Sequence, residues 1–160
     1  MEDIWNITAL VVSVLSVLLS LYALRQATTK NTSDMYLFFI SQYAKEDMKL
    51  ALRKLTDIKR GVYRLEQWES DMKNNLPKAF EYDEARRLVK YFYDTLAYMK
   101  LEKLIEARFV RLICLKKGAW LYLDTVEAME KFFDSGYDKK PYAVIRDVCE
   151  NLRKEGCCPP

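Results

Sequence analysis

The sequence predicts an all-α fold: one N-terminal transmembrane helix followed by a cytoplasmic bundle of four to six helices. Three observations support this fold class. Residues 4–24 form an uncharged apolar run, IWNITALVVSVLSVLLSLYAL. Apolar residues elsewhere recur every three or four positions, and no segment alternates with a period of two. Gly and Pro number only four each in 160 residues, so few turns are expected.

The N-terminal apolar run has the length of a membrane span. At about 1.5 Å rise per residue it matches a hydrocarbon core of about 30 Å. Trp5 and Tyr22 stand near its two ends, where aromatic rings favour the membrane interface. The acidic start, Met1-Glu2-Asp3, is unlike the basic start of a cleaved signal peptide. We therefore expect an uncleaved anchor.

The flanking charges predict the orientation of this anchor. No Lys or Arg precedes the run, whereas Arg25 and Lys30 follow it. Short basic flanks stay on the cytoplasmic side, so we expect a single-pass protein of the cell membrane with its N-terminus outside. The expected domains are a short outer N-terminus, the span, a linker, the cytoplasmic bundle and a tail, at residues 1–3, 4–24, 25–33, 34–156 and 157–160.

Small side chains line one face of the predicted span at a period of about 3.5 residues. They are Ala9, Ser13, Ser16, Ser20 and Ala23. Such a face lets two membrane helices approach closely, which predicts a homo-oligomer or a membrane-protein partner. In the alternative interpretation, the serine hydroxyls bond to carbonyls of their own helix and the spacing has no further role.

Basic residues outnumber acidic ones between Arg25 and Arg60. Those that could face anionic lipids of the bilayer are Arg25, Lys30, Lys45, Lys49 and Arg53. The face of residues 45–60 is thus an alternative binding site for anionic lipid or nucleic acid, with nucleic acid the less expected partner. The simpler interpretation is a solvated helix face, because acidic residues are mixed among the basic ones.

The first two bundle helices follow from apolar spacing and from turn residues. The first covers residues 34–62 and ends near Gly61. Its predicted core stripe is Leu37, Ile40, Ala44, Met48, Ala51, Leu55, Ile58 and Val62. A short helix follows within residues 63–75, with Leu65, Trp68 and Met72 on one side. The sequence Asn74-Asn75-Leu76-Pro77 breaks this helix.

Four further helices complete the predicted bundle. Residues 83–104 form the clearest one, with Ala85, Leu88, Val89, Phe92, Leu96 and Met99 on its core face. Residues 106–117 form a shorter one that Gly118 ends. Residues 120–133 form the next, with Leu123, Val126, Met129 and Phe133 inward. The last runs from Pro141 to Gly156, and its stripe is Tyr142, Ile145, Val148, Cys149 and Leu152.

Reactive motifs are missing from the sequence. The chain has no histidine, which removes the commonest metal ligand and general base. Cys114 and Cys149 lie in apolar helices and are expected to be small core residues. No C-x2-C pair or G-x4-G-K loop occurs, and the Cys157-Cys158 tail fits a frayed end better than a lipidation signal. We therefore predict no enzyme, no catalytic residue, no cofactor and no metal.

Two pairs of oppositely charged residues lie on two of the predicted helices. Arg86 and Arg87 lie on one helix, and Glu127 and Glu130 lie on another. An ion pair that fixes the register of the bundle is the simplest use for them. They are also the residues to change first if the chain is an enzyme with an unrecognised site, the less favoured alternative.

The order of these elements resembles a family of small prokaryotic single-pass membrane proteins with a helical cytoplasmic domain of unknown function. The residues that carry the resemblance are Ala51-Leu52-Arg53-Lys54-Leu55, the helix from Arg86 to Phe92, Leu104-Ile105, Trp120 with Glu127, and the tyrosine-led last helix. The resemblance implies a helical domain on one membrane helix and no known activity. We expect an interaction module, acting as a scaffold, sensor or regulatory subunit through protein binding or oligomerisation.

Overall fold

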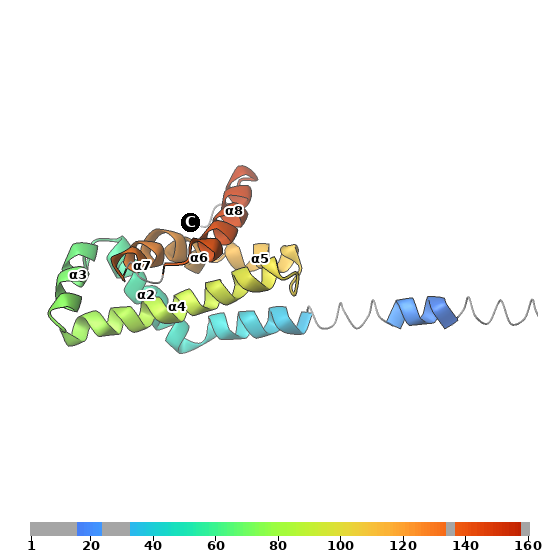
Figure 1. Ribbon diagram of the computed structural model, residues 1–160, viewed down its shortest axis with the longest axis horizontal. Helices are drawn as coiled ribbons and strands as arrows, with labels where there is room; N and C mark the ends of the chain where they lie inside the picture. The colour runs from blue at the N-terminus through green and yellow to red at the C-terminus, as the bar shows by residue number, and fades with distance from the viewer. Residues whose placement is uncertain (1–15, 24–32, 134–136, 158–160) are drawn as a thin grey trace, which may run out of the picture. The chain divides into compact units, whose positions relative to one another are not determined.

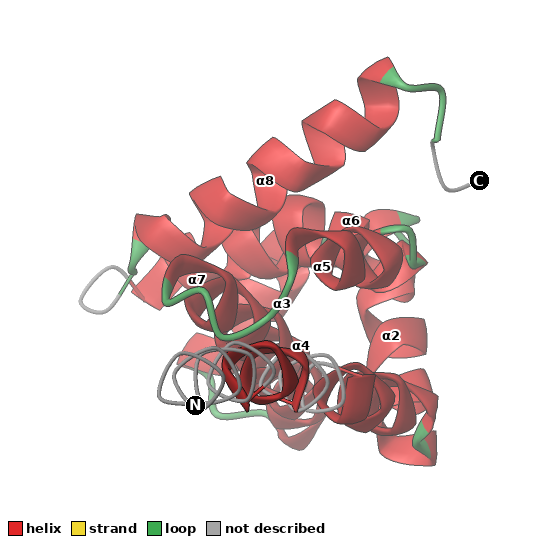
Figure 2. Cartoon of the chain, turned by 90° about the vertical axis from the view of Figure 1, so that its right-hand side faces the viewer, coloured by secondary structure: helices red, strands yellow, loops and turns green. Residues whose placement is uncertain are grey.

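The computed structural model describes residues 16–23, 33–133 and 137–157, and these are helical with no strand (Figures 1 and 2). The predicted all-α class is thus confirmed. The chain divides into two compact units, Met1–Leu37 and Phe38–Pro160. The described part of the second unit contains the helices α2 to α8, a π-helix, η1, between α6 and α7, and the end of the helical segment 33–44. These are more than the four to six helices predicted.

The predicted localisation needs a correction. Within residues 16–23, 33–133 and 137–157, no helix combines the length and the apolar character that a membrane crossing requires. This finding contradicts the prediction of a single-pass protein of the cell membrane with an outer N-terminus and a cytoplasmic domain. A crossing needs about 20 consecutive apolar residues, whereas the helix described in this region covers residues 16–23. The rest of the predicted span lies outside the described residues.

The predicted helix 34–62 is two helices. Residues 33–44 are helical, the backbone of Lys45 is extended (φ −60°, ψ 148°), and α2 then runs over Glu46–Lys59. The predicted core stripe is confirmed within α2, where Met48, Ala51, Leu55 and Ile58 are buried. The end at Gly61 is also confirmed: its φ of +73° suits glycine, and the Val62 N–H bonds back to the Asp57 carbonyl. Leu37 and Val62 are exposed, so the stripe is shorter than predicted.

Helix α3 (Leu65–Lys73) and helix α4 (Pro77–Leu101) meet at a tight turn. Asn75 takes the left-handed conformation (φ 54°), which breaks the chain where the sequence predicts a break. Helix α4 starts at Pro77 rather than at the predicted Asp83, because proline is well suited to the first turn of a helix. The buried Trp68 ring ties the two helices together, since its Nε1–H donates to the Ala79 carbonyl at 3.2 Å.

Helix α4 is the long helix on which the second unit is built (Figure 1). It packs against α2, α3, α8 (Lys139–Lys154) and η1 (Tyr122–Val126). It is consequently buried on several sides, so its buried surface is wider than the single apolar stripe predicted from the sequence. Leu88 of that stripe is 37% exposed, whereas Tyr82, Asp83, Arg86, Tyr93 and Ala97 are buried in addition to the predicted residues.

Gly118 has a different role from the helix stop predicted for it. Helix α5 covers Ala107–Cys114, and Gly118 lies inside the next helix, α6 (Lys117–Leu121). A Cβ at this glycine would lie 2.7 Å from Tyr93 Oη and 3.0 Å from Tyr43 Cε2. Its N–H also donates to Tyr43 Oη at 3.1 Å. Glycine is present here because two tyrosine rings approach the backbone closely.

The predicted helix 120–133 is also interrupted. The π-helix η1 follows α6 and leads into α7 (Glu127–Phe133). Its extra residue shifts the buried face, so Tyr122 and Thr125 are buried while the predicted Leu123 is only half-buried. The last stripe is confirmed in full within α8, and Cys114 and Cys149 are buried core residues as predicted.

Candidate functional site

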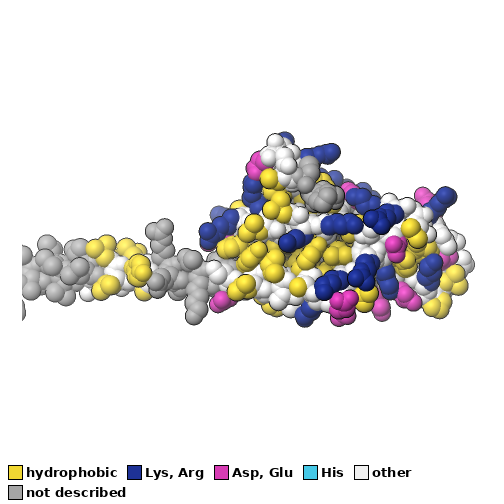
Figure 3. Space-filling model, turned by 180° about the vertical axis from the view of Figure 1, so that it is seen from behind, with side chains coloured by type: hydrophobic (Ala, Val, Ile, Leu, Met, Phe, Trp, Pro, Cys, Tyr) yellow, Lys and Arg dark blue, Asp and Glu magenta, His cyan; other side chains and the backbone are white. Residues whose placement is uncertain are grey.

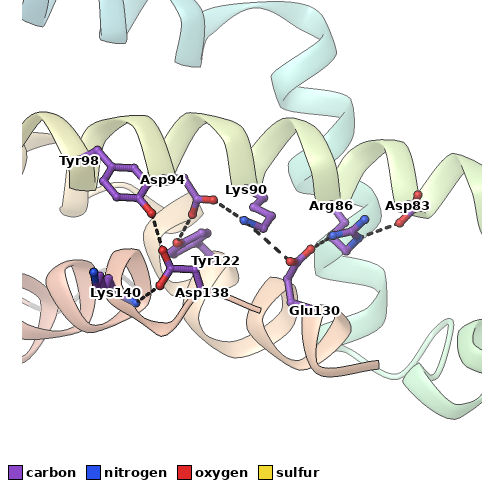
Figure 4. Close-up of polar contacts among 9 residues, drawn as sticks. All are labelled: Asp83, Arg86, Lys90, Asp94, Tyr98, Tyr122, Glu130, Asp138 and Lys140. Atoms are coloured by element: carbon purple, nitrogen blue, oxygen red, sulfur yellow. Dashed lines mark hydrogen bonds and ion pairs between the residues drawn. The ribbon is translucent and has the colours of Figure 1, made fainter. Parts of the chain in front are cut away.

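Five polar side chains follow one another along α4 and form what we call the polar row (Figure 4). They are Asp83, Arg86, Lys90, Asp94 and Tyr98. Their spacing of three or four residues places them on one face of the helix. This face meets η1, α7 and the residue that precedes α8, and each of these contributes one polar partner.

The first half of the polar row is a buried ion-pair network. The Arg86 Nε–H donates to Asp83 Oδ1 at 2.7 Å, and its guanidinium pairs with Glu130 of α7. The Arg86 and Glu130 side chains are only 9% and 8% exposed. Lys90 lies 3.8 Å from Glu130. The exposed side chain of Arg87 pairs with the second carboxylate oxygen of Asp83, at a distance of 2.5 Å. The predicted contact between the arginine and glutamate helices is thus confirmed for Arg86 and Glu130.

The second half of the polar row joins α4 to tyrosine and aspartate side chains. Lys90 pairs with Asp94, which accepts a hydrogen bond from Tyr122 Oη at 2.5 Å. Burial, reinforced by this bond to Asp94, raises the pKa of Tyr122 well above its usual value. Tyr98 Oη donates to Asp138 at 2.5 Å. That bond and the Lys140 N–H lower the pKa of Asp138.

The polar row is suited to holding helices in register rather than to chemistry. Each of its charges has an opposite charge beside it, and its central members are shielded from solvent. The second predicted glutamate, Glu127, faces away from the row and pairs with Arg146, Lys131 and Tyr137. Sequence analysis missed the rest of the row and its partners, namely Lys90, Asp94, Tyr98, Tyr122 and Asp138. The spacing of charged residues along α4 would have identified Asp94, but nothing in the sequence reveals Tyr122 as its partner.

A second charged feature lies on α2, and we call it the basic hollow. It is a depression of about 390 Å³ lined by Lys49, Leu52, Arg53, Thr56, Asp57, Arg60 and Lys117. It brings the predicted basic residues Lys49 and Arg53 together with two that the prediction left out, Arg60 and Lys117. On the face of the molecule in Figure 3, Lys and Arg side chains lie on both sides of a hydrophobic band.

A third feature is an apolar groove of about 260 Å³ between the segment of residues 38–48 and α4. Its lining residues are Phe38, Phe39, Gln42, Lys45, Asp47, Met48, Leu88, Tyr91, Phe92 and Thr95. Lys45, predicted to face lipid, therefore lies at this groove and away from the basic hollow. Arg25 and Lys30 lie outside the described residues.

The other predicted residues give no site in the described parts of the chain. Ser20 Oγ donates to the Ser16 carbonyl at 2.8 Å, a bond within its own helix, and Ala23 is exposed. Ala9 and Ser13 lie outside the described residues, so the small-residue face stays a prediction. Within residues 16–23, 33–133 and 137–157, no three potential metal ligands gather into a cluster.

Comparison with known proteins adds no relative. No protein-family model matches the chain, and the searches of curated proteins and of solved structures found no match. The family resemblance inferred from the sequence therefore stays a prediction.

Proposed function

We propose that this chain is a helical interaction module that binds an amphipathic helix of a partner protein in its apolar groove. One observation carries the proposal: four aromatic side chains line the groove, and two of them remain open to solvent although a well-packed core lies directly beneath them. Tyr91 is 75% exposed, and Phe38 and Leu88 are also exposed. Exposed aromatic clusters of this kind favour protein binding over catalysis.

The groove has the anatomy of a binding surface. Its floor is rigid, because the buried rings of Phe39 and Phe92 pack edge to face with centroids 5.4 Å apart. Polar side chains border it, namely Gln42, Lys45, Asp47 and Thr95. An apolar centre with a polar rim is the usual arrangement of protein interfaces.

The shape of the groove favours a helix as the occupant. It runs between two helical segments, residues 38–44 and α4, and the seam between a helix pair accepts the ridge of a third helix. The same seam continues between α2 and α4 as a shallower hollow lined in part by Leu50, Glu81 and Glu84. A helix bound along this seam would place apolar residues on the groove and a basic residue opposite Glu84.

Site-specific cross-linking tests this proposal. A photoreactive phenylalanine analogue replaces Tyr91 in the full chain, expressed in its own cells, and the cross-linked peptides are sequenced. The control carries the analogue at Leu104, an exposed residue outside the groove. We expect one recurrent partner at position 91 and none at position 104, through a segment with apolar residues three or four apart and a basic end.

The binding strength of that segment completes the test. A synthetic peptide of the linked segment should become helical on binding, and Tyr91→Ala should weaken its affinity at least tenfold while Leu104→Ala leaves it unchanged. Cross-links only to a second copy of this chain would instead make the groove a homo-oligomer contact. Equal labelling from both positions would refute a binding site in the groove.

A further inference from the structure

We infer that the basic hollow binds a small ligand that carries at least two linked phosphate groups. Helix periodicity creates most of the hollow, because Lys49, Arg53, Thr56 and Arg60 follow one another along one side of α2. The fold adds Lys117, which lies at the start of α6, far away in the sequence. Four cations thus surround one depression.

Three of the four cations of the hollow have no ion-pair partner within the part of the chain that the structure describes. Arg53, Arg60 and Lys117 make no ion pair with any described residue. Lys49 lies 3.3 Å from Glu46, but both side chains are more than half exposed, so this pair is weak. Asp57 is the only carboxylate in the described lining. An anion bound among these four cations would relieve their mutual repulsion.

The chemistry of the lining favours phosphate groups. An arginine guanidinium presents paired N–H donors that match two oxygens of a phosphate, and lysine adds a point charge. Two arginines and two lysines can neutralise a charge larger than that of one phosphate. The hollow's volume of about 390 Å³ lies in the usual range of small-molecule sites, and Leu52 offers an apolar contact for the rest of the ligand.

The surroundings of the hollow argue for a small ligand and against a nucleic acid. A nucleic-acid strand needs a longer cationic track with aromatic platforms. The hollow instead has acidic neighbours: Glu46 at the start of α2 and Asp124, which pairs with the nearby Lys59 at 2.6 Å. These two carboxylates would repel a strand that extended beyond the hollow.

Calorimetric titration of the full chain with inorganic pyrophosphate tests this inference. The variant is Arg53→Gln combined with Arg60→Gln, which removes two cations from the hollow. The control is Arg153→Gln combined with Lys154→Gln, which removes two exposed cations from the last turn of α8. Circular dichroism confirms that each variant is folded, and titration of a 20-nucleotide RNA measures binding of an extended polyanion.

We expect saturable binding of one pyrophosphate per chain, weakened at least tenfold in the hollow variant and within twofold of the wild type in the control. Inorganic monophosphate should bind more weakly than pyrophosphate. Equal weakening in both variants, or no binding of pyrophosphate, would overturn the inference. RNA that binds more tightly than pyrophosphate, and that loses affinity in the hollow variant, would assign the site to nucleic acid instead.

Discussion

Two neighbouring helices use charge in opposite ways. On α4, the polar row is enclosed by other helices, and Asp83, Arg86 and Lys90 each lie beside an opposite charge. On α2, the basic hollow faces solvent, and Arg53 and Arg60 have no ion-pair partner among the described residues. The two regions are similarly rich in charged residues in the sequence, so the residue types alone do not separate them.

The difference teaches that pairing and burial, rather than charge density, mark a structural role, whereas the binding role that we infer needs unpaired cations gathered around one depression. A buried charge without a partner is strongly destabilising, so the polar row must be complete for the helices to pack. An exposed charge costs little when it has no partner, because water solvates it. It therefore stays available for a ligand. The following predictions test this contrast, beginning with the largest expected effect.

Removing one member of the buried network should have the largest effect. Arg86→Ala leaves the carboxylates of Asp83 and Glu130 buried without their main partner, and we expect a loss of about 3–5 kcal/mol in the free energy of unfolding. Arg87→Ala is the matched control, because its side chain is 68% exposed while it contacts the same Asp83. The control should lose at most about 1 kcal/mol. Urea denaturation measures both, and equal losses would contradict the structural role of the row.

Removing a neutral partner of the row should have a smaller effect. Tyr122→Phe deletes the hydroxyl that donates to Asp94 and keeps the ring stacked against Tyr142. Because Asp94 retains Lys90, we expect a loss of about 1–2 kcal/mol in unfolding free energy. Tyr91→Phe changes an exposed ring in the same way and should alter stability by less than about 0.5 kcal/mol. Indistinguishable stabilities of these two variants would show that the Tyr122 hydroxyl does not stabilise the polar row.

The exposed end of the row should add a pH dependence. The bonds from Tyr98 and from the Lys140 N–H lower the pKa of Asp138 in the folded state below its unfolded value. The contribution of the Asp138 carboxylate to the stability of the fold is therefore complete above a pH of about 4, and it is lost as the pH falls through the lowered pKa. We expect Asp138→Asn to reduce the acid-induced loss of stability, and Tyr98→Phe to reduce it in part. Denaturation curves between pH 2 and pH 6 that match the wild type in both variants would refute this assignment.

The basic hollow should contribute least to stability. Arg53→Gln removes a cation that makes no ion pair with any described residue, so the unfolding free energy should change by less than about 0.5 kcal/mol. At low salt the variant should be slightly more stable than the wild type, because repulsion with Arg60 and Lys117 is reduced. Urea denaturation at low and high salt measures this difference. A loss of 2 kcal/mol or more would show that Arg53 has a structural role.

Much of the fold follows from local sequence patterns. Gly61 and Asn74-Asn75-Leu76-Pro77 end helices where the sequence predicts, and the stripe of α8 is buried in full. These features depend on residues close together in the chain. The break at Lys45, the π-helix η1 and the buried Gly118 were not predicted, because each depends on packing between distant segments. Gly118 shows this most clearly, since Tyr43 and Tyr93 determine its surroundings.

The candidate sites were predictable only in part, for the same reason. The sequence predicts an ion pair between the Arg86-Arg87 helix and the Glu127-Glu130 helix, but only the structure shows that Arg86 and Glu130 are the pair that forms. The basic stretch of residues 45–60 was also noticed, but its residues serve different features in the structure. Lys45 lines the apolar groove, Lys54 pairs with Glu81, and Arg53 lines the basic hollow. Only the fold reveals which cations are paired and that Lys117 joins them.

Thermal unfolding of three proteins, with and without pyrophosphate, tests the contrast most directly. A ligand that binds only the folded state raises the melting temperature. We predict that Arg86→Ala melts well below the wild type and is still stabilised by pyrophosphate. The Arg53→Gln, Arg60→Gln double variant should melt close to the wild type and should gain nothing from pyrophosphate. Two results would contradict the separation of structural from binding charges. One is a double variant whose melting temperature rises with pyrophosphate as much as that of the wild type. The other is an Arg86→Ala variant whose melting temperature equals that of the wild type.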